Sequence, residues 1–177
     1  MDSMSNLILI GPMGAGKSTN GKWLAKQLGK SFVDMDAYIE QKAGTSITHI
    51  FELEGEAGFR QREANALAKL LALDNQVIAT GGGCILMPDN RALMKRSGIV
   101  VYMHIPPEVQ LQRLLNDKKR PLLQTKDRAE RLQQLAMERN PLYQSCADIT
   151  LDITRIPMSQ IRPHLLQSII DSTRLKS

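Results

Sequence analysis

The chain has 177 residues, and 23 lysines and arginines against 18 aspartates and glutamates give it a formal net charge of +5. Its 42% hydrophobic and 23% charged residues are typical of a folded globular domain, which excludes disorder, collagen-like repeats and a disulfide scaffold. No apolar stretch approaches the roughly 20 residues that cross a membrane, and the run over residues 7–10 is too short for a secretory signal. We therefore expect one domain over residues 1–177, and the two cysteines fit a reduced, cytoplasmic protein.

Short β-like runs alternate with helical stretches along the chain. Apolar residues at positions 64, 67, 68 and 71 repeat with helical spacing, as on one face of a helix. In chain order, we expect a strand over residues 7–10, a helix over 17–28, a strand over 31–34, a helix from about Glu56, strands over 77–80 and 99–105, helices from the Pro106–Pro107 pair and over 128–137, a strand over 149–153 and a last helix from Pro157. This alternation predicts an α/β fold with a parallel sheet covered on both faces, whose ligands bind beyond the carboxyl ends of the strands.

The clearest motif follows the first expected strand. Residues 11–18 read Gly-Pro-Met-Gly-Ala-Gly-Lys-Ser and match the phosphate-binding pattern G-x-x-x-x-G-K-[ST], between a strand and a helix. Glycines allow successive backbone N–H groups to converge on phosphate oxygens, and the helix N-terminus adds partial positive charge. Lys17 can reach the β- and γ-phosphates, and the Ser18 hydroxyl can bind Mg²⁺. The motif predicts nucleotide binding but does not distinguish a kinase from a switch GTPase or a motor.

Two aspartates, Asp34 and Asp36, stand at the end of the second expected strand. On an extended segment both side chains would face the same side, toward the phosphate loop. One carboxylate could then hold Mg²⁺, while the other could hydrogen-bond an acceptor hydroxyl or take its proton. A strand end followed by a helix cap explains the same pair without any function.

Three further features are candidates for the second substrate. Gly81, Gly82 and Gly83 follow another strand end, where they either let the backbone approach a ligand or form a simple turn. Arg60 and Arg139 carry guanidinium groups that suit bidentate carboxylate recognition, although an isolated arginine more often lies in solvent.

A basic run, Lys118-Lys119-Arg120, has Arg113 before it and Lys126 and Arg128 after it. A basic excess suggests anionic partners. Because aromatic residues make up only 4% of the chain, a stacking platform for single-stranded nucleic acid is disfavoured. The run could fold over a bound nucleotide and exclude water, or it could be a charged surface loop.

Together these motifs resemble the shikimate kinase family. The stretches that carry the resemblance are 11–19, 34–36, 53–60, 79–83, 118–123 and 138–143. The phosphate loop is shared by many proteins, but the joint set, in this order over residues 7 to about 155, is specific.

The resemblance implies a P-loop three-layer α/β/α fold of the nucleoside-monophosphate-kinase type, with a five-stranded parallel sheet. It implies a helical shikimate-binding region at about residues 34–62 and a lid at about 113–126. The implied activity is the ATP-dependent phosphorylation of the 3-hydroxyl of shikimate, a step toward the aromatic amino acids, with Mg²⁺ as cofactor. The implied partners are ATP, ADP and shikimate, with no nucleic acid and no membrane, and the protein is expected to be a monomer.

The resemblance also assigns roles to individual residues. Lys17, Asp36 and Arg120 are expected to be catalytic, and Ser18 and Asp34 to hold the metal. Asp36 would bind the shikimate hydroxyls, and Arg60 and Arg139 the carboxylate. The expected nucleotide-binding residues are Gly14, Ala15, Gly16, Lys17, Ser18, Thr19, Arg113, Arg120 and Arg155. The expected substrate-binding residues are Asp36, Arg60, Gly81, Gly82, Gly83 and Arg139.

Two rival interpretations remain at this stage. A related small-molecule kinase, for gluconate or a nucleotide, would keep both the phosphate loop and the lid. A P-loop switch or nucleic-acid-binding module without enzymatic activity would use the basic excess as its main surface.

Overall fold

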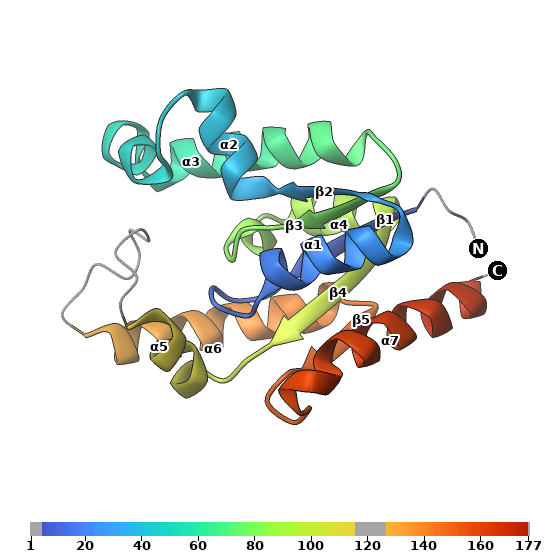
Figure 1. Ribbon diagram of the computed structural model, residues 1–177. Helices are drawn as coiled ribbons and strands as arrows, with labels where there is room; N and C mark the ends of the chain where they lie inside the picture. Colours follow the sequence, from blue (N-terminus) through green and yellow to red (C-terminus); the bar gives the residue numbers. More distant parts are fainter. Residues whose placement is uncertain (1–4, 116–126, 177) are drawn as a thin grey trace.

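The computed structural model of the protein describes residues 5–115 and 127–176. These residues form an α/β fold around a parallel sheet with the strand order β2-β3-β1-β4-β5 (Figure 1). The strands are β1 (Asn6–Ile10), β2 (Ser31–Asp34), β3 (Gln76–Ala79), β4 (Gly98–His104) and β5 (Ile149–Asp152). Every neighbouring pair is parallel, so the carboxyl ends of all five described strands meet at one edge of the sheet. The predicted strands are confirmed, with bounds within one residue.

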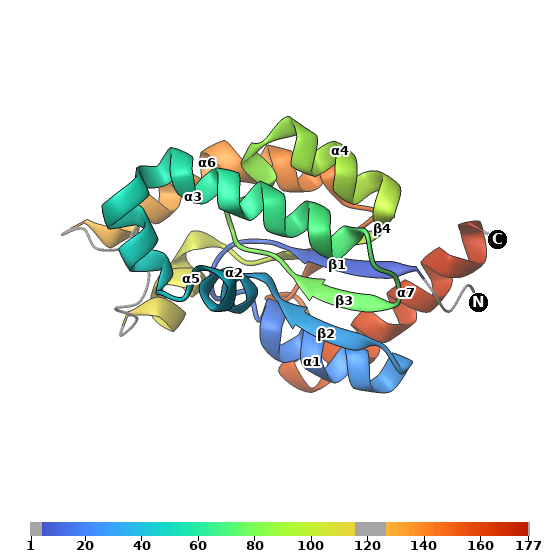
Figure 2. The ribbon, with the colours of Figure 1, turned by 90° about the horizontal axis from the view of Figure 1, so that it is seen from above.

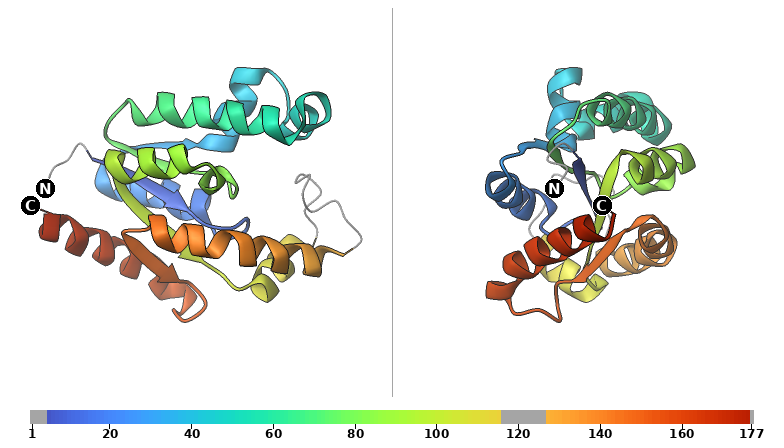
Figure 3. Two further views of the ribbon diagram at one scale, coloured as in Figure 1. Left: turned by 180° about the vertical axis from the view of Figure 1, so that it is seen from behind. Right: turned by 90° about the vertical axis from the view of Figure 1, so that its right-hand side faces the viewer.

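The helices divide into two layers because alternate residues of each strand face opposite sides of the sheet. The helices are α1 (Lys17–Leu28), α2 (Met35–Ala43), α3 (Ile47–Leu71), α4 (Pro88–Ser97), α5 (Pro107–Leu114), α6 (Arg128–Cys146) and α7 (Ile161–Lys176), with short 3-10 turns at η1 (Cys84–Leu86) and η3 (Met158–Gln160). Ile8 and Ile10 of β1 pack with the face covered by α3, α4 and α6, whereas Leu7 and Leu9 pack with the face covered by α1 and α7 (Figure 2). The end-on view in Figure 3 shows the same sandwich.

Several helices differ from their predicted bounds. No bounds were predicted for α2, which falls in the helical region expected at about 34–62, or for α4. Helix α7 begins at Ile161 rather than at Pro157, which caps the η3 turn. The helix predicted from about Glu56 begins at Ile47 and is interrupted at Gly55, whose φ of 70° is not helical. The predicted helix therefore corresponds only to the segment of α3 that follows Gly55.

Helix α6 runs well beyond its predicted end at Met137. It continues through Pro141 to Cys146. A proline removes one backbone hydrogen bond, but Arg139, Tyr143 and Cys146 keep facing the sheet at helical spacing and are buried. Tertiary packing therefore outweighs the proline, and the extra turns bring Arg139 to the edge of the sheet where the phosphate loop lies.

Among the described residues, no helix is both long and apolar enough to cross a membrane. All the loops that follow the carboxyl ends of the strands lie at one edge of the sheet, and this edge carries the phosphate loop, the two aspartates and the three glycines.

Candidate active site

The phosphate loop connects β1 to α1 at the centre of the sheet. Gly11 has a φ of 144°, and a Cβ atom there would collide with the carbonyl oxygen of Met103 on β4. Gly16 caps α1 with a φ of 88°, in the left-handed region that glycine adopts without strain. The loop backbone therefore turns tightly against β4 and directs the N-terminus of α1 toward any bound anion.

Lys17 is buried although it is charged. Its Nζ donates hydrogen bonds to the carbonyl oxygens of Gly11 at 2.6 Å and Pro12 at 2.9 Å. These bonds hold the ammonium group against the loop, where it can compensate the charge of a phosphate.

Asp34 serves two neighbours with its two carboxylate oxygens. Its Oδ2 accepts a hydrogen bond from the Ser18 hydroxyl at 2.5 Å, and its Oδ1 caps helix α2 by accepting from the Ala37 N–H at 3.1 Å. Both interpretations of this residue are therefore compatible with the geometry: it is a helix cap, and it places a hard oxygen ligand beside the serine of the phosphate loop.

The structural argument that placed Asp36 on an extended segment is wrong. Asp36 lies in the first turn of α2, which begins at Met35. Its Oδ1 nevertheless lies 2.9 Å from the position that a Cβ atom would take on Gly81. The start of a helix, rather than the pleat of a strand, therefore brings this carboxylate to the triple-glycine turn.

Arg60, Glu63 and Arg139 form a buried charged cluster around the same turn. Arg60 donates from Nη1 to Glu63 Oε1 at 2.9 Å, and from Nη2 to the exposed Glu56 at 3.4 Å. The side chains of Glu63 and Arg139 are almost entirely buried. Glu63 Oε2 and the Nε atoms of both arginines have no hydrogen-bond partner among the described residues. Buried polar groups without partners are costly, so this cluster is suited to receive a polar ligand.

Burial shifts the ionisation of this cluster. It raises the pKa of Glu63, an effect that the neighbouring Arg60 opposes. It also lowers the pKa of Arg139. Perturbed groups of this kind gather at functional sites. Glu63 was absent from the candidates found in the sequence; the available signal was an acid between Phe59, Ala66 and Leu67, on a helix face that is otherwise apolar.

The three glycines make room for these charged side chains. A Cβ atom on Gly83 would collide with the Arg60 guanidinium, and one on Gly81 would lie 3.0 Å from Glu63 Oε2. On Gly82 it would lie 3.5 Å from Arg139 Nη1. The absence of side chains on this turn is therefore what allows the cluster to pack against the backbone.

The remaining candidates surround the phosphate loop less tightly. Arg113, on α5, donates to the carbonyl oxygen of Gly14 at 2.8 Å. Arg155 follows β5, is largely exposed, and pairs with Asp152 at 3.3 Å. Thr19 is exposed in the first turn of α1, and Arg120 lies outside the described residues.

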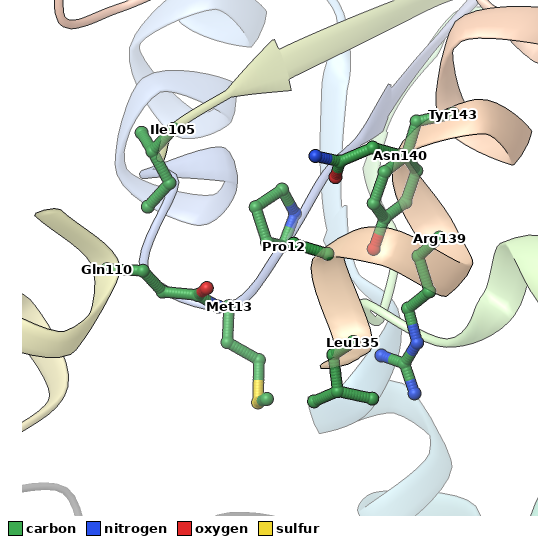
Figure 4. A pocket seen from close by; sticks show the side chains of 9 residues that line it. Pro12, Met13, Ile105, Gln110, Leu135, Arg139, Asn140 and Tyr143 are labelled. Carbon is green, nitrogen blue, oxygen red and sulfur yellow. The ribbon is translucent and has the colours of Figure 1, made fainter. Parts of the chain in front are cut away.

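A pocket lies between the phosphate loop and α6, and Arg139 is the member of the charged cluster that lines it (Figure 4). Arg139 and Tyr143 line it from α6, and Pro12 and Met13 line it from the loop. Its lining residues are Pro12, Met13, Ile105, Gln110, Leu135, Ala136, Arg139, Asn140 and Tyr143. The space beside the phosphate loop is therefore continuous with the position of Arg139.

The parallel sheet, the phosphate loop after β1 and the charged cluster at the same edge define a P-loop kinase. A family model described as shikimate kinase matches residues 13–170. The shikimate kinase of Halorhodospira halophila is 52% identical over 150 residues, covering 85% of each chain. That of Actinobacillus pleuropneumoniae is 46% identical over 169 residues, covering 96% of this chain and 98% of that protein. The chain belongs to the shikimate kinase family.

Solved structures agree with this assignment. The shikimate kinase of Acinetobacter baumannii in complex with shikimate has a TM-score of 0.89 at 44% identity, covering 98% of this chain and 95% of that one. The shikimate kinase of Aquifex aeolicus has a TM-score of 0.82 at 36% identity, covering 97% and 99%. A gluconokinase from Sinorhizobium meliloti, at 15% identity and a TM-score of 0.55, shares the fold alone. The predicted fold class and family are confirmed, and the rival gluconate kinase has no comparable support.

Proposed function

We propose that the protein transfers the γ-phosphoryl group of ATP to the 3-hydroxyl of shikimate and releases ADP and shikimate 3-phosphate. The observation that carries this conclusion is the convergence of a phosphate loop and a buried Arg–Glu–Arg cluster at one sheet edge, in a chain of the shikimate kinase family. The related Acinetobacter baumannii enzyme was solved with shikimate bound.

The phosphate loop would hold the triphosphate of ATP. Backbone N–H groups of Gly14, Ala15 and Gly16 and of the first turn of α1, including Thr19, would bind phosphate oxygens. Lys17 would exchange its bonds to the loop carbonyls for bonds to the β- and γ-phosphates. Because the charge on the transferred group spreads over its oxygens in the transition state, a preorganised ammonium group there lowers the barrier.

Mg²⁺ is the cofactor that this site would take. The Ser18 hydroxyl and the Asp34 carboxylate are adjacent hard oxygen donors, and Mg²⁺ is usually bound by one or two such groups together with substrate phosphates. Within residues 5–115 and 127–176, no group of three or more histidine, cysteine or acidic side chains could hold a metal by itself. When bound, the ion supplies charge neutralisation on the phosphates.

The charged cluster would hold shikimate. Arg60 and Arg139 would bind its carboxylate with the guanidinium groups that crowd the triple-glycine turn. Asp36, beside Gly81, would orient the 3-hydroxyl and take its proton as the oxygen attacks the γ-phosphorus and the bond to the β–γ bridging oxygen breaks. Gly81, Gly82 and Gly83 would contribute close backbone contacts.

The regional assignments extend this proposal. Residues of about 34–62, which include α2 and the first segment of α3, would form the shikimate-binding region, within a single domain over 1–177. A lid over about 113–126 would bring Arg120 to the nucleotide. Arg113 and Arg155 would lie on the adenine side of the bound ATP. The hydrogen bond from Arg113 to Gly14 supports the placement of Arg113.

We further propose that the protein acts as a monomer in the cytoplasm, without nucleic acid or membrane partners. Both cysteines are buried free thiols, which supports a reducing compartment. Light scattering on the purified protein tests the oligomeric state, and a dimer would contradict it.

A coupled assay of ADP release tests the reaction. We expect release to depend on both Mg²⁺ and shikimate, with little release when gluconate or a nucleoside replaces shikimate. Equal rates with and without shikimate would contradict the proposed function, and salt-sensitive binding to DNA or RNA without turnover would favour the non-enzymatic rival.

A further inference from the structure

Helix α6 carries a second side chain that reaches the triple-glycine turn. Tyr143 lies four residues after Arg139, so the two side chains share one face of the helix (Figure 4). The Tyr143 hydroxyl is buried and donates a hydrogen bond of 2.5 Å to the carbonyl oxygen of Gly82. This bond joins two segments that are 61 residues apart in the sequence.

The ring of Tyr143 is fixed as firmly as its hydroxyl. It stacks on the Tyr102 ring of β4, with centroids 4.9 Å apart and an angle of 26° between the planes. The Tyr102 hydroxyl points away from Gly82: it is hydrogen-bonded to His104 Nδ1 at 2.8 Å and donates to Asn140 Oδ1 at 3.3 Å. Stacking on a strand residue therefore fixes the ring from which the Tyr143 hydroxyl points from α6 toward Gly82.

Arg139 lies against both partners of the Tyr143–Gly82 hydrogen bond. Its Nη1 packs against Gly82, the residue whose carbonyl Tyr143 holds. Burial lowers the pKa of Arg139, and the adjacent Tyr143 oxygen acts in the opposite direction by favouring the charged form. The Tyr143 hydroxyl is a donor at neutral pH, as a tyrosine ordinarily is, and burial raises its pKa further.

We propose that Tyr143 is a positioning residue that fixes the Gly82 backbone and the Arg139 guanidinium relative to each other, and thereby sets the affinity for the carboxylate of the acceptor. The inference rests on the proposed function, because it assigns Tyr143 to the same acceptor site. Tyr143 acts through Arg139 and Gly82, and it does not act on the transferred phosphoryl group.

The decisive variant is Tyr143→Phe, which keeps the stacked ring and removes only the hydroxyl. We expect the KM for shikimate to rise about tenfold, as for the loss of a buried hydrogen bond that supports a charged group. The KM for ATP and kcat should stay within about twofold of the wild type. Steady-state kinetics at saturating ATP, at a temperature where circular dichroism shows the variant folded, measures this.

Tyr102→Phe is the matched control. It also removes one hydroxyl from a buried tyrosine and keeps the stacked ring pair, but this hydroxyl contacts His104 and Asn140 rather than Gly82. We expect a comparable fall in the unfolding midpoint and an unchanged KM for shikimate. If both variants raise that KM equally, Tyr143 has a structural role only and the proposal is overturned.

A double-mutant cycle tests whether Tyr143 acts through Arg139. In an Arg139→Ala background, Tyr143→Phe should change the KM for shikimate less than twofold, because the group that it positions is gone. An undiminished tenfold effect in that background overturns the proposal. Failure of the proposed function is distinguishable, because the wild-type protein would then release no ADP in response to shikimate.

Discussion

The phosphate loop and the charged cluster, taken together with Asp36 and the triple-glycine turn beside it, lie at the same edge of the sheet but are built in opposite ways. The loop takes its groups from eight consecutive residues, and its geometry is local to one strand–helix connection. The cluster takes Asp36 from α2, Arg60 and Glu63 from α3, the three glycines from the turn after β3, and Arg139 from α6. A contiguous site tolerates changes elsewhere, whereas a dispersed one depends on the packing of every contributing element.

The largest expected effect is that of a substitution in the phosphate loop. Lys17→Ala removes a buried ammonium group that, in the proposed function, would contact the transferred phosphates with a contribution that grows as charge develops. We expect kcat to fall at least about 100-fold, with the KM for shikimate changed by less than about threefold. Initial rates of ADP release measure both quantities. A lowered affinity for shikimate at unchanged kcat would contradict the assigned role.

Arg139→Ala tests the charged cluster as the proposed site of the shikimate carboxylate. Losing one guanidinium from a carboxylate site should raise the KM for shikimate about 10- to 100-fold, while the KM for ATP stays close to that of the wild type. Misplaced shikimate would also lower kcat to a smaller extent. The matched comparison is Arg96→Ala on α4, which should leave all three parameters unchanged. Wild-type kinetics in Arg139→Ala would remove its carboxylate role.

The pH dependence of folding stability tests the burial of Glu63 in the charged cluster. Burial raises the pKa of Glu63 above its ordinary value of 4.5, so the folded protein binds that proton more tightly than the unfolded chain. The stabilisation that the protonated Glu63 side chain contributes is therefore fully present below pH 4.5, the ordinary pKa of the unfolded chain. It is lost as the pH rises through the pKa of the folded state. We expect the stability of the wild type relative to Glu63→Gln to fall as the pH rises above 4.5. Urea denaturation across the range measures it, and parallel stability curves would contradict the prediction.

The smallest expected effect concerns the periphery of the phosphate loop. Arg113→Ala removes one exposed hydrogen bond to the Gly14 carbonyl. We expect the KM for ATP to rise about threefold, since an exposed bond of this kind contributes little. The KM for shikimate should not change. A loss of activity as large as that of Lys17→Ala would place Arg113 in the catalytic step itself.

The comparison also explains which sequence predictions held. Strands β1, β3 and β4 are buried apolar runs, and the helix over residues 17–28 is bounded by glycines; these local signals place them within one residue of their predicted positions. The end of α6 was missed because Pro141 is a local stop signal that buried Tyr143 and Cys146 override. The position of Asp36 was argued from an extended segment because the start of α2 gives no signal beyond its Asp34 cap.

The sequence by itself determined the phosphate loop, the alternation of strands and helices and the family, because each is carried by short contiguous stretches whose pattern can be recognised locally. Only the tertiary structure decided that Glu63 stands between Arg60 and Gly81, and that Tyr143 holds the carbonyl of Gly82. These contacts join elements that are distant in the chain. Their partners are selected by burial and by the packing of α3 and α6 on one face of the sheet, and no local pattern records that packing.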